Sequence, residues 1–250
     1  MLNQPLDKAV SFVKSLYQDF KEFLAPSSCL CCGRGKDFDD PLLCPTCTEN
    51  LRRNNIGVGP ICPFCSRPEG AGTPCQYCAL PDHLRLYYWG RYEEELRDCL
   101  LQFKFHRAID LGNRLVELAG NSLAERIASN RYDFILPMPL HKVREKEREY
   151  NQSEILAKKV AGILNVQMRC DCLIRNRATR QQAKLDDKEK WENVRDAFSL
   201  APNTELILRG KAILLIDDIV TTGATVYEAA RPLWEAGVAK INIFSLAYSR

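Results

Sequence analysis

The sequence has no run of about eighteen apolar residues, the length that a membrane-spanning helix requires. Its first residues lack the basic segment and apolar core of a signal peptide. Neither the Gly-Lys-Ser/Thr of a P-loop nor the G-x-G-x-x-G of a dinucleotide-binding turn occurs. The net charge is only +3, so composition alone indicates no polyanionic partner. These absences argue against a membrane span and two common nucleotide sites, and we expect a cytoplasmic protein.

Residues 212–226 combine an apolar run with a polar turn. The run at 212–216 is typical of a strand buried on both faces of a parallel sheet, and it ends at two adjacent carboxylates, Asp217 and Asp218. Ionised carboxylates only accept hydrogen bonds, so they suit the vicinal hydroxyls of a sugar. The turn that follows opens a predicted helix through Ala236. Its residues are Thr221, Thr222, Gly223, Ala224 and Thr225.

This turn has the chemistry of a phosphate site. Its backbone N–H groups, its threonine hydroxyls and the positive end of a helix dipole meet at one point. Gly223 lets the backbone approach a phosphate without an intervening side chain. Together with the acidic pair, the turn predicts a site for a ribose 5-phosphate. The alternative is a buried strand whose aspartates only cap the next helix.

Eight of the twelve cysteines form Cys-x-x-Cys pairs within residues 29–78. Each pair can supply two thiolates to a tetrahedral ion, and four cysteine ligands leave no position for water. We therefore expect two structural zinc sites and no catalytic one. The pairs can combine in sequence (first with second, third with fourth) or interleaved (first with third, second with fourth), and we favour the sequential arrangement. The expected ligands are Cys29, Cys32, Cys44, Cys47, Cys62, Cys65, Cys75 and Cys78, with Cys31 as an alternative.

The chain divides into three regions. Apolar residues at helical spacing predict an amphipathic helix within residues 1–28, which we expect to pack against the protein rather than on a membrane. Residues 29–83 form the cysteine-rich module. From residue 84 to residue 250, apolar strands alternate with helices, which is typical of an α/β domain with a parallel sheet.

Several motifs resemble those of a known family. Residues 213–226 look like the phosphoribosyl-pyrophosphate (PRPP) binding motif of type I phosphoribosyltransferases. The cysteine pairs, Phe-Lys-Phe at 103–105, Pro-Met-Pro-Leu at 137–140 and Arg-Glu-Tyr-Asn-Gln at 148–152 precede it in the order of the ComF (GntX-like) family. Members combine a cysteine-rich module with a type I phosphoribosyltransferase domain and are linked to natural competence and to incoming single-stranded DNA. Glu149 departs from the pattern, because the family usually has glycine there.

The resemblance implies roles for particular residues. Asp217 and Asp218 would hold the ribose hydroxyls, and residues 221–225 would wrap the 5-phosphate. The loop after the predicted strand 133–136 would contact pyrophosphate, although alternating charge is more often a solvated helical face. A carboxylate at Glu149 would repel that pyrophosphate. The basic candidates for its contacts are Lys104, Lys142, Arg144, Arg148, Arg175 and Arg180.

The basic stretch 175–184 allows three interpretations, since it carries positive charges and no negative one. It is a surface loop, a mobile flap that closes over pyrophosphate, or a contact for single-stranded nucleic acid without stacking aromatics.

Two functions follow from the resemblance. The first is an enzyme that, with Mg²⁺, displaces pyrophosphate from PRPP at the anomeric carbon. The second is a non-catalytic competence adaptor that binds single-stranded DNA or a translocation helicase, with PRPP as a regulator.

Overall fold

The computed structural model describes residues 28–35, 40–55, 57–68, 84–105, 108–127, 130–179 and 186–249. The predicted N-terminal amphipathic helix, Cys75, Cys78 and Arg180 therefore lie outside the described residues.

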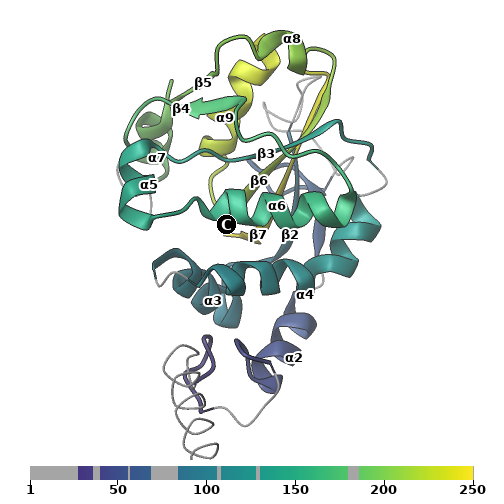
Figure 1. Cartoon of the computed structure of the whole chain (residues 1–250), viewed down its shortest axis with the longest axis vertical. Coiled ribbons are helices and arrows are strands. Elements are labelled where there is room, and N and C mark those ends of the chain that lie inside the picture. The colour runs from purple at the N-terminus through teal and green to yellow at the C-terminus, as the bar shows by residue number, and fades with distance from the viewer. Residues whose placement is uncertain are drawn as a thin grey trace, which may run out of the picture.

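The described elements alternate between strands and helices, which confirms the predicted α/β fold (Figure 1). The strands are β1 (Val58–Ile61), β2 (Arg85–Arg91), β3 (Phe134–Pro137), β4 (Leu173–Arg175), β5 (Phe198–Leu200), β6 (Ala212–Val220) and β7 (Lys240–Tyr248). The helices are α2 (Pro45–Asn54), α3 (Glu94–Phe105), α4 (Ile109–Ile127), α5 (Lys142–Arg148), α6 (Gln152–Leu164), α7 (Asp187–Val194), α8 (Glu205–Leu208) and α9 (Ala224–Glu235).

The main sheet has the strand order β1-β2-β7-β6-β3. Strands β2, β7, β6 and β3 are mutually parallel, whereas β1 is an antiparallel edge strand on β2. Strand β6 lies between β7 and β3 and therefore has a parallel neighbour on each side, and its carboxyl end lies where parallel α/β sheets bind ligands. Strand β1 comes from the cysteine-rich segment, so part of that segment is built into the main sheet.

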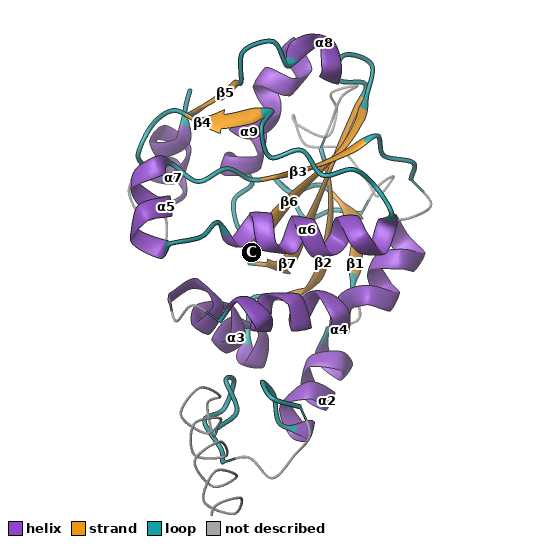
Figure 2. Cartoon of the chain, viewed as in Figure 1, coloured by secondary structure: helices purple, strands orange, loops and turns teal. Residues whose placement is uncertain are grey.

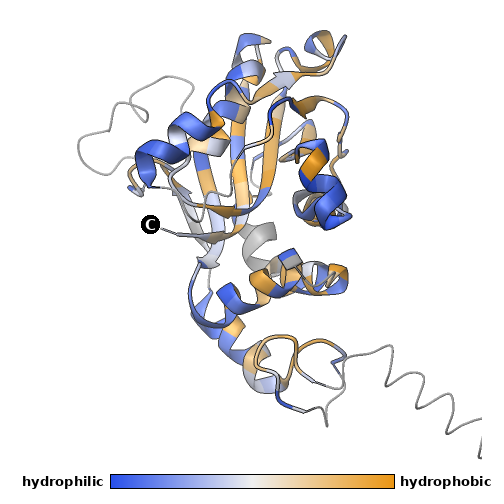
Figure 3. Ribbon diagram, turned by 90° about the vertical axis from the view of Figure 1, so that its left-hand side faces the viewer, coloured by the Kyte–Doolittle hydropathy of each residue, from blue (hydrophilic) through white to orange (hydrophobic). Residues whose placement is uncertain are grey.

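The sheet is covered on both faces, and Figure 2 shows helices on either side of it. Leu214 and Ile216 of β6 pack in one core cluster, with residues of α3, α4 and α6. Ile213 and Leu215 alternate with them and pack in the other, with residues of β4, β5 and α9. Hydrophobic colouring accordingly runs along the strands at the centre of the molecule (Figure 3). The prediction of a strand buried on both faces is confirmed.

Strand β6 differs from expectation at its end. It does not stop at the acidic pair but continues through Asp217 and Asp218 to Val220, because Asp217 keeps its register with Ser245 and Ile219 with Ala247 on β7. Both carboxylates are therefore fixed by the sheet itself. None of the helices in the described part of the chain has the length and apolar composition of a membrane span.

Helix α3 is held against α4 by a close contact. A Cβ added to Gly112 of α4 would lie 2.5 Å from the ring of Phe103, so only glycine leaves room for that fully buried ring. The backbone carbonyl of Phe103 also accepts a hydrogen bond from the hydroxyl of Tyr150. The last turn of α3, which carries Lys104, is therefore firmly positioned.

Candidate functional site

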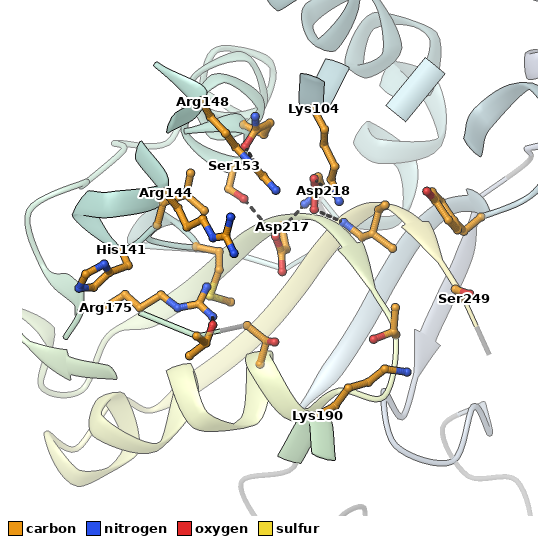
Figure 4. A pocket seen from close by; sticks show the side chains of 18 of the residues that line it. Lys104, His141, Arg144, Arg148, Ser153, Arg175, Lys190, Asp217, Asp218 and Ser249 are labelled. Atoms are coloured by element: carbon orange, nitrogen blue, oxygen red, sulfur yellow. Dashed lines mark hydrogen bonds and ion pairs between the residues drawn. The ribbon is translucent and has the colours of Figure 1, made fainter. Parts of the chain in front are cut away.

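The acidic pair lines a cavity of about 490 Å³ at the carboxyl end of β6. Side chains from α3, α5, α6, β4, α7 and the turn after β6 line this cavity, and most of them are polar (Figure 4). The elements come from distant parts of the sequence and meet here because β6 is an inner strand of the sheet, between β7 and β3.

Lys104 neutralises one of the two carboxylates. Its Nζ lies 2.9 Å from Oδ2 of Asp218, and both side chains are largely buried. Oδ1 of Asp218 accepts a hydrogen bond of 2.7 Å from the backbone N–H of Ile219. The resemblance implied a pyrophosphate contact for Lys104, and the structure places its ammonium at the acidic pair.

The second carboxylate, Asp217, is held by weaker donors. Its Oδ1 accepts hydrogen bonds from the hydroxyl of Ser153 at 3.1 Å and from the backbone N–H of Asp218 at 2.9 Å. Burial raises the pKa of Asp217 to about 7, the charge of Asp218 adds to this rise, and Lys104 opposes it. Asp217 therefore gains and loses its proton near neutral pH.

The turn 221–225 joins β6 to the N-terminus of α9. Thr221 and Thr225 line the cavity, while the hydroxyl of Thr222 accepts a hydrogen bond of 3.4 Å from the N–H of Ala224. Gly223 has a φ of +81°, in the left-handed region that glycine adopts without strain. The geometry is that of a helix N-terminus facing a cavity, as an anion site requires.

Basic side chains approach the same cavity from α5, β4 and α7. Those that line it are Arg144, Arg148, Arg175 and Lys190, in addition to Lys104. Arg144 pairs with Glu147 at 2.7 Å, and Arg148 donates to Gln152 at 3.0 Å. In Figure 4 the acidic pair lies between these arginines and Lys190.

The positive charge of Arg175 is only partly compensated by its surroundings. Burial lowers its pKa, and the neighbouring Arg144, Arg148 and Arg177 lower it further, although Asp217 opposes them. Its guanidinium donates to Thr179 at 2.6 Å, while its buried Nε has no hydrogen-bond partner among the described residues. A bound anion would neutralise the buried positive charge and could accept a hydrogen bond from the Nε of Arg175.

Other predicted residues take different places. Lys142 is exposed on α5 and is not among the residues that line the cavity. Glu149 ends α5 with a φ of +67°, and its backbone N–H bonds to the carbonyl of Glu145. The position thus favours glycine because of its backbone conformation. Glu149 is also absent from the lining residues, so the expected repulsion of pyrophosphate has no structural support.

Sequence reasoning missed several lining residues, among them Ser153, His141 and Lys190. His141 caps α5 by accepting a hydrogen bond from Val143, and Lys190 pairs with Asp187 at 3.1 Å within α7. Lys190 lies in a stretch of mixed charge that resembles an ordinary exposed helix, so no sequence signal marked it.

Four cysteines form a metal-ligand cluster. The sulfur atoms of Cys29, Cys32, Cys44 and Cys47 all lie within 4.8 Å of one another, and those of Cys32 and Cys44 are 3.9 Å apart. Tetrahedral zinc with Zn–S bonds of 2.3 Å would place its sulfurs about 3.8 Å apart, so the cluster fits such an ion. The structure thus brings the first two Cys-x-x-Cys pairs together, as the sequential arrangement would require.

Cys31 does not join this cluster. Its thiol points to α3, where it donates to the carbonyl of Glu95 at 3.7 Å. Asn50 of α2 donates to the Glu95 carboxylate at 2.6 Å, and Arg114 of α4 pairs with Asp40 at 3.0 Å. The segment that holds the cysteine cluster therefore contacts α3, which carries Lys104, and α4, which packs against α3.

Comparisons with known proteins identify relatives of this chain. A family model described as a phosphoribosyl transferase domain matches residues 151–250. The DNA utilization protein YhgH of Escherichia coli (strain K12) is 30% identical over 213 residues, covering 82% of this chain and 89% of YhgH. Competence protein F of Haemophilus influenzae is 28% identical and covers 82% and 90%. Competence protein ComFC of Bacillus subtilis is 29% identical and covers 84% and 85%.

The ion pair at Asp218 makes a prediction about the titration of its neighbour. Replacing Lys104 by methionine removes the charge that opposes the raised pKa of Asp217, so that pKa should rise above its value of about 7. Carbon-13 NMR of labelled aspartate carboxyls measures the midpoint directly. Lys190→Met is the matched control, because Lys190 lines the same cavity but pairs with Asp187. Equal midpoints in the two variants would contradict the assigned role of Lys104.

Proposed function

The chain belongs to the ComF family of phosphoribosyltransferase-domain proteins, and from this premise we propose that it binds PRPP with Mg²⁺ and transfers the phosphoribosyl group with release of pyrophosphate. The observation that carries the proposal is the meeting of three chemistries in one cavity. The turn 221–225 suits the 5-phosphate, the acidic pair suits the ribose diol, and the arginines suit pyrophosphate.

The arginines support the leaving-group side of the reaction. Transfer forms a bond between C1 of the ribose and a nucleophile, which loses its proton, while the C1–O bond breaks and pyrophosphate leaves with the electron pair. Negative charge then grows on pyrophosphate next to Arg144 and Arg175, where it is stabilised. Positive charge grows on the ribose ring, close to Asp217 and Asp218.

The acidic pair also fits a divalent cation. Asp217 and Asp218 supply the hard oxygen donors that Mg²⁺ prefers. Since Lys104 already lies 2.9 Å from Asp218, the cation would rely mainly on oxygens of PRPP and on Asp217. When bound, Mg²⁺ would supply charge neutralisation for pyrophosphate.

We assign the cysteine cluster to a structural zinc ion. All four coordination positions would be filled by Cys29, Cys32, Cys44 and Cys47, which leaves none for a substrate. The ion would stabilise α2 and, through Asn50 and Cys31, the start of α3. Cys62 and Cys65 would belong to a second such site together with Cys75 and Cys78.

A role in competence is the second candidate, supported by the names of the relatives. In this interpretation the chain is an adaptor for single-stranded DNA or a translocation helicase, with PRPP as a regulator. Two basic residues of the proposed DNA contact are engaged within the protein. Arg175 lines the cavity, and Arg177 donates to the carbonyls of Asn193 and Arg195. The position of Arg175 in the cavity favours a small anionic ligand over DNA for this residue.

Titration calorimetry with PRPP and Mg²⁺ tests the proposed function. Wild-type protein should bind, and Asp217→Asn combined with Asp218→Asn should weaken binding at least about tenfold, because each carboxylate loses a charged hydrogen bond to the diol. Lys142→Met is the matched control, since Lys142 is exposed on α5 outside the cavity, and it should bind as wild type does. No heat with wild-type protein, or equal affinity of the acidic-pair variant, would refute the proposal.

The affinity should also depend on pH through Asp217. The diol needs an ionised acceptor, and the pKa of Asp217 is about 7, so affinity should rise between pH 6 and pH 8. The 5-phosphate of the ligand titrates near pH 6 as well. Asp217→Asn separates the two titrations, because it removes the pH dependence due to Asp217 and keeps the pH dependence due to the ligand's 5-phosphate. A variant with the same pH profile as wild-type protein would show that Asp217 does not titrate in binding.

A further inference from the structure

The third Cys-x-x-Cys pair begins a tight turn, Cys62–Ser66, that directly follows β1. The N–H of Cys62 donates to the carbonyl of Arg67 at 2.9 Å, and the N–H of Ser66 donates to the carbonyl of Cys62 at 2.9 Å. The turn at Cys29 has the same two bonds, from Cys29 to Arg34 and from Gly33 to Cys29. The Cys62–Ser66 turn therefore has the same backbone hydrogen bonds as the turn at Cys29.

This turn lies directly against the proposed phosphate loop. A Cβ added to Gly223 would lie 2.8 Å from Cδ1 and Cε1 of Phe64 and 3.1 Å from the carbonyl oxygen of Pro63. The space that a side chain at position 223 would need is thus occupied by Phe64 and Pro63 of the cysteine-rich segment. Gly223 is required both for its positive φ and for this contact.

Phe64 also joins this contact to the two helices beside the loop. Its ring is buried and lies edge-on to Tyr227 of α9, with centroids 5.8 Å apart, and 6.0 Å from the ring of Trp191 of α7. The N–H of Tyr227 in turn donates to the carbonyl of Gly223 at 3.0 Å. Trp191 is the neighbour of Lys190, which lines the cavity.

A second contact ties the turn to the end of the sheet. The hydroxyls of Ser66 and Tyr248 share a hydrogen bond of 2.6 Å, and Tyr248 is fully buried at the end of β7. The next residue, Ser249, lines the cavity and donates its N–H to the carbonyl of Val220 at 3.0 Å. The turn therefore supports the phosphate loop behind Gly223 and, through Tyr248, the strand ends beside it.

We propose that Phe64 is a positioning residue for the sugar-phosphate end of the site, holding the loop 221–225 in its phosphate-binding conformation. Part of the cysteine-rich segment then supports the binding loop from behind and is not a separate appendage. The physical reason is preorganisation: a loop already ordered by Phe64 loses less conformational entropy when the phosphate binds. This inference rests on the proposed function, because it assigns the loop to the 5-phosphate.

The test compares two ligands that would use opposite ends of the cavity, ribose 5-phosphate and inorganic pyrophosphate. Phe64→Leu keeps an apolar side chain but removes the ring from Gly223. It should weaken ribose 5-phosphate binding about tenfold, or about 1.4 kcal/mol, and leave pyrophosphate binding unchanged. Phe64→Tyr keeps the ring edge and should restore the wild-type affinity. Trp234→Phe is the matched control, because Trp234 packs on Tyr227 in the same aromatic group, with centroids 5.7 Å apart.

Fluorescence of Trp191 provides a readout that a general loss of stability does not reproduce. In a Trp89→Phe and Trp234→Phe background, which leaves Trp191 as the one tryptophan of the sequence, ribose 5-phosphate should change the fluorescence with Phe64 or Phe64→Tyr, and not with Phe64→Leu at the same ligand concentration. Equal weakening of both ligands in Phe64→Leu would show a general structural defect and overturn the inference. Wild-type affinity of that variant for ribose 5-phosphate would overturn it while leaving the proposed function intact. Absence of ribose 5-phosphate binding by wild-type protein would overturn this inference, and the proposed function fails with it only if PRPP does not bind either.

Discussion

The adjacent carboxylates of Asp217 and Asp218, fixed by the register of β6, are the constraint on which the rest of the site depends. Two unit charges 4 Å apart near a protein surface repel by about 4 kcal/mol at an effective dielectric constant of about 20. The fold offsets this repulsion with the ammonium of Lys104, the hydroxyl of Ser153 and two backbone N–H groups. A ribose diol would add further hydrogen-bond donors to this pair.

The cysteine-rich segment contacts the elements around the acidic pair in two places. Through Asn50 and Cys31, the cluster of four cysteines holds the start of α3, whose last turn carries Lys104 to Asp218. Through Phe64, the next cysteine turn lies against Gly223 of the loop after β6. Strand β1 lies between the two in the sequence and pairs with the main sheet. This arrangement gives a physical reason for a cysteine-rich segment and a phosphoribosyltransferase domain to occur in one chain.

The sequence predicted the features that are local in the chain. The strand, the acidic pair and the turn 221–225 are contiguous, so their pattern alone placed them, and the Cys-x-x-Cys spacing placed the first ligand cluster. Lys190 and Phe64 were missed, because each reaches the site from a distant element and looks ordinary in its own segment. Lys142 was included with Arg144 and Arg148 because charge pattern does not show which face of α5 meets the cavity.

The central claim is that one cavity holds a PRPP molecule in a single orientation, and a crystal structure of protein soaked with PRPP and Mg²⁺ measures this most directly. The account predicts electron density with the 5-phosphate in the turn 221–225, the diol on Asp217 and Asp218, and the pyrophosphate against Arg144 and Arg175. An empty cavity at saturating ligand, or a PRPP molecule bound with its pyrophosphate in the turn, would contradict it.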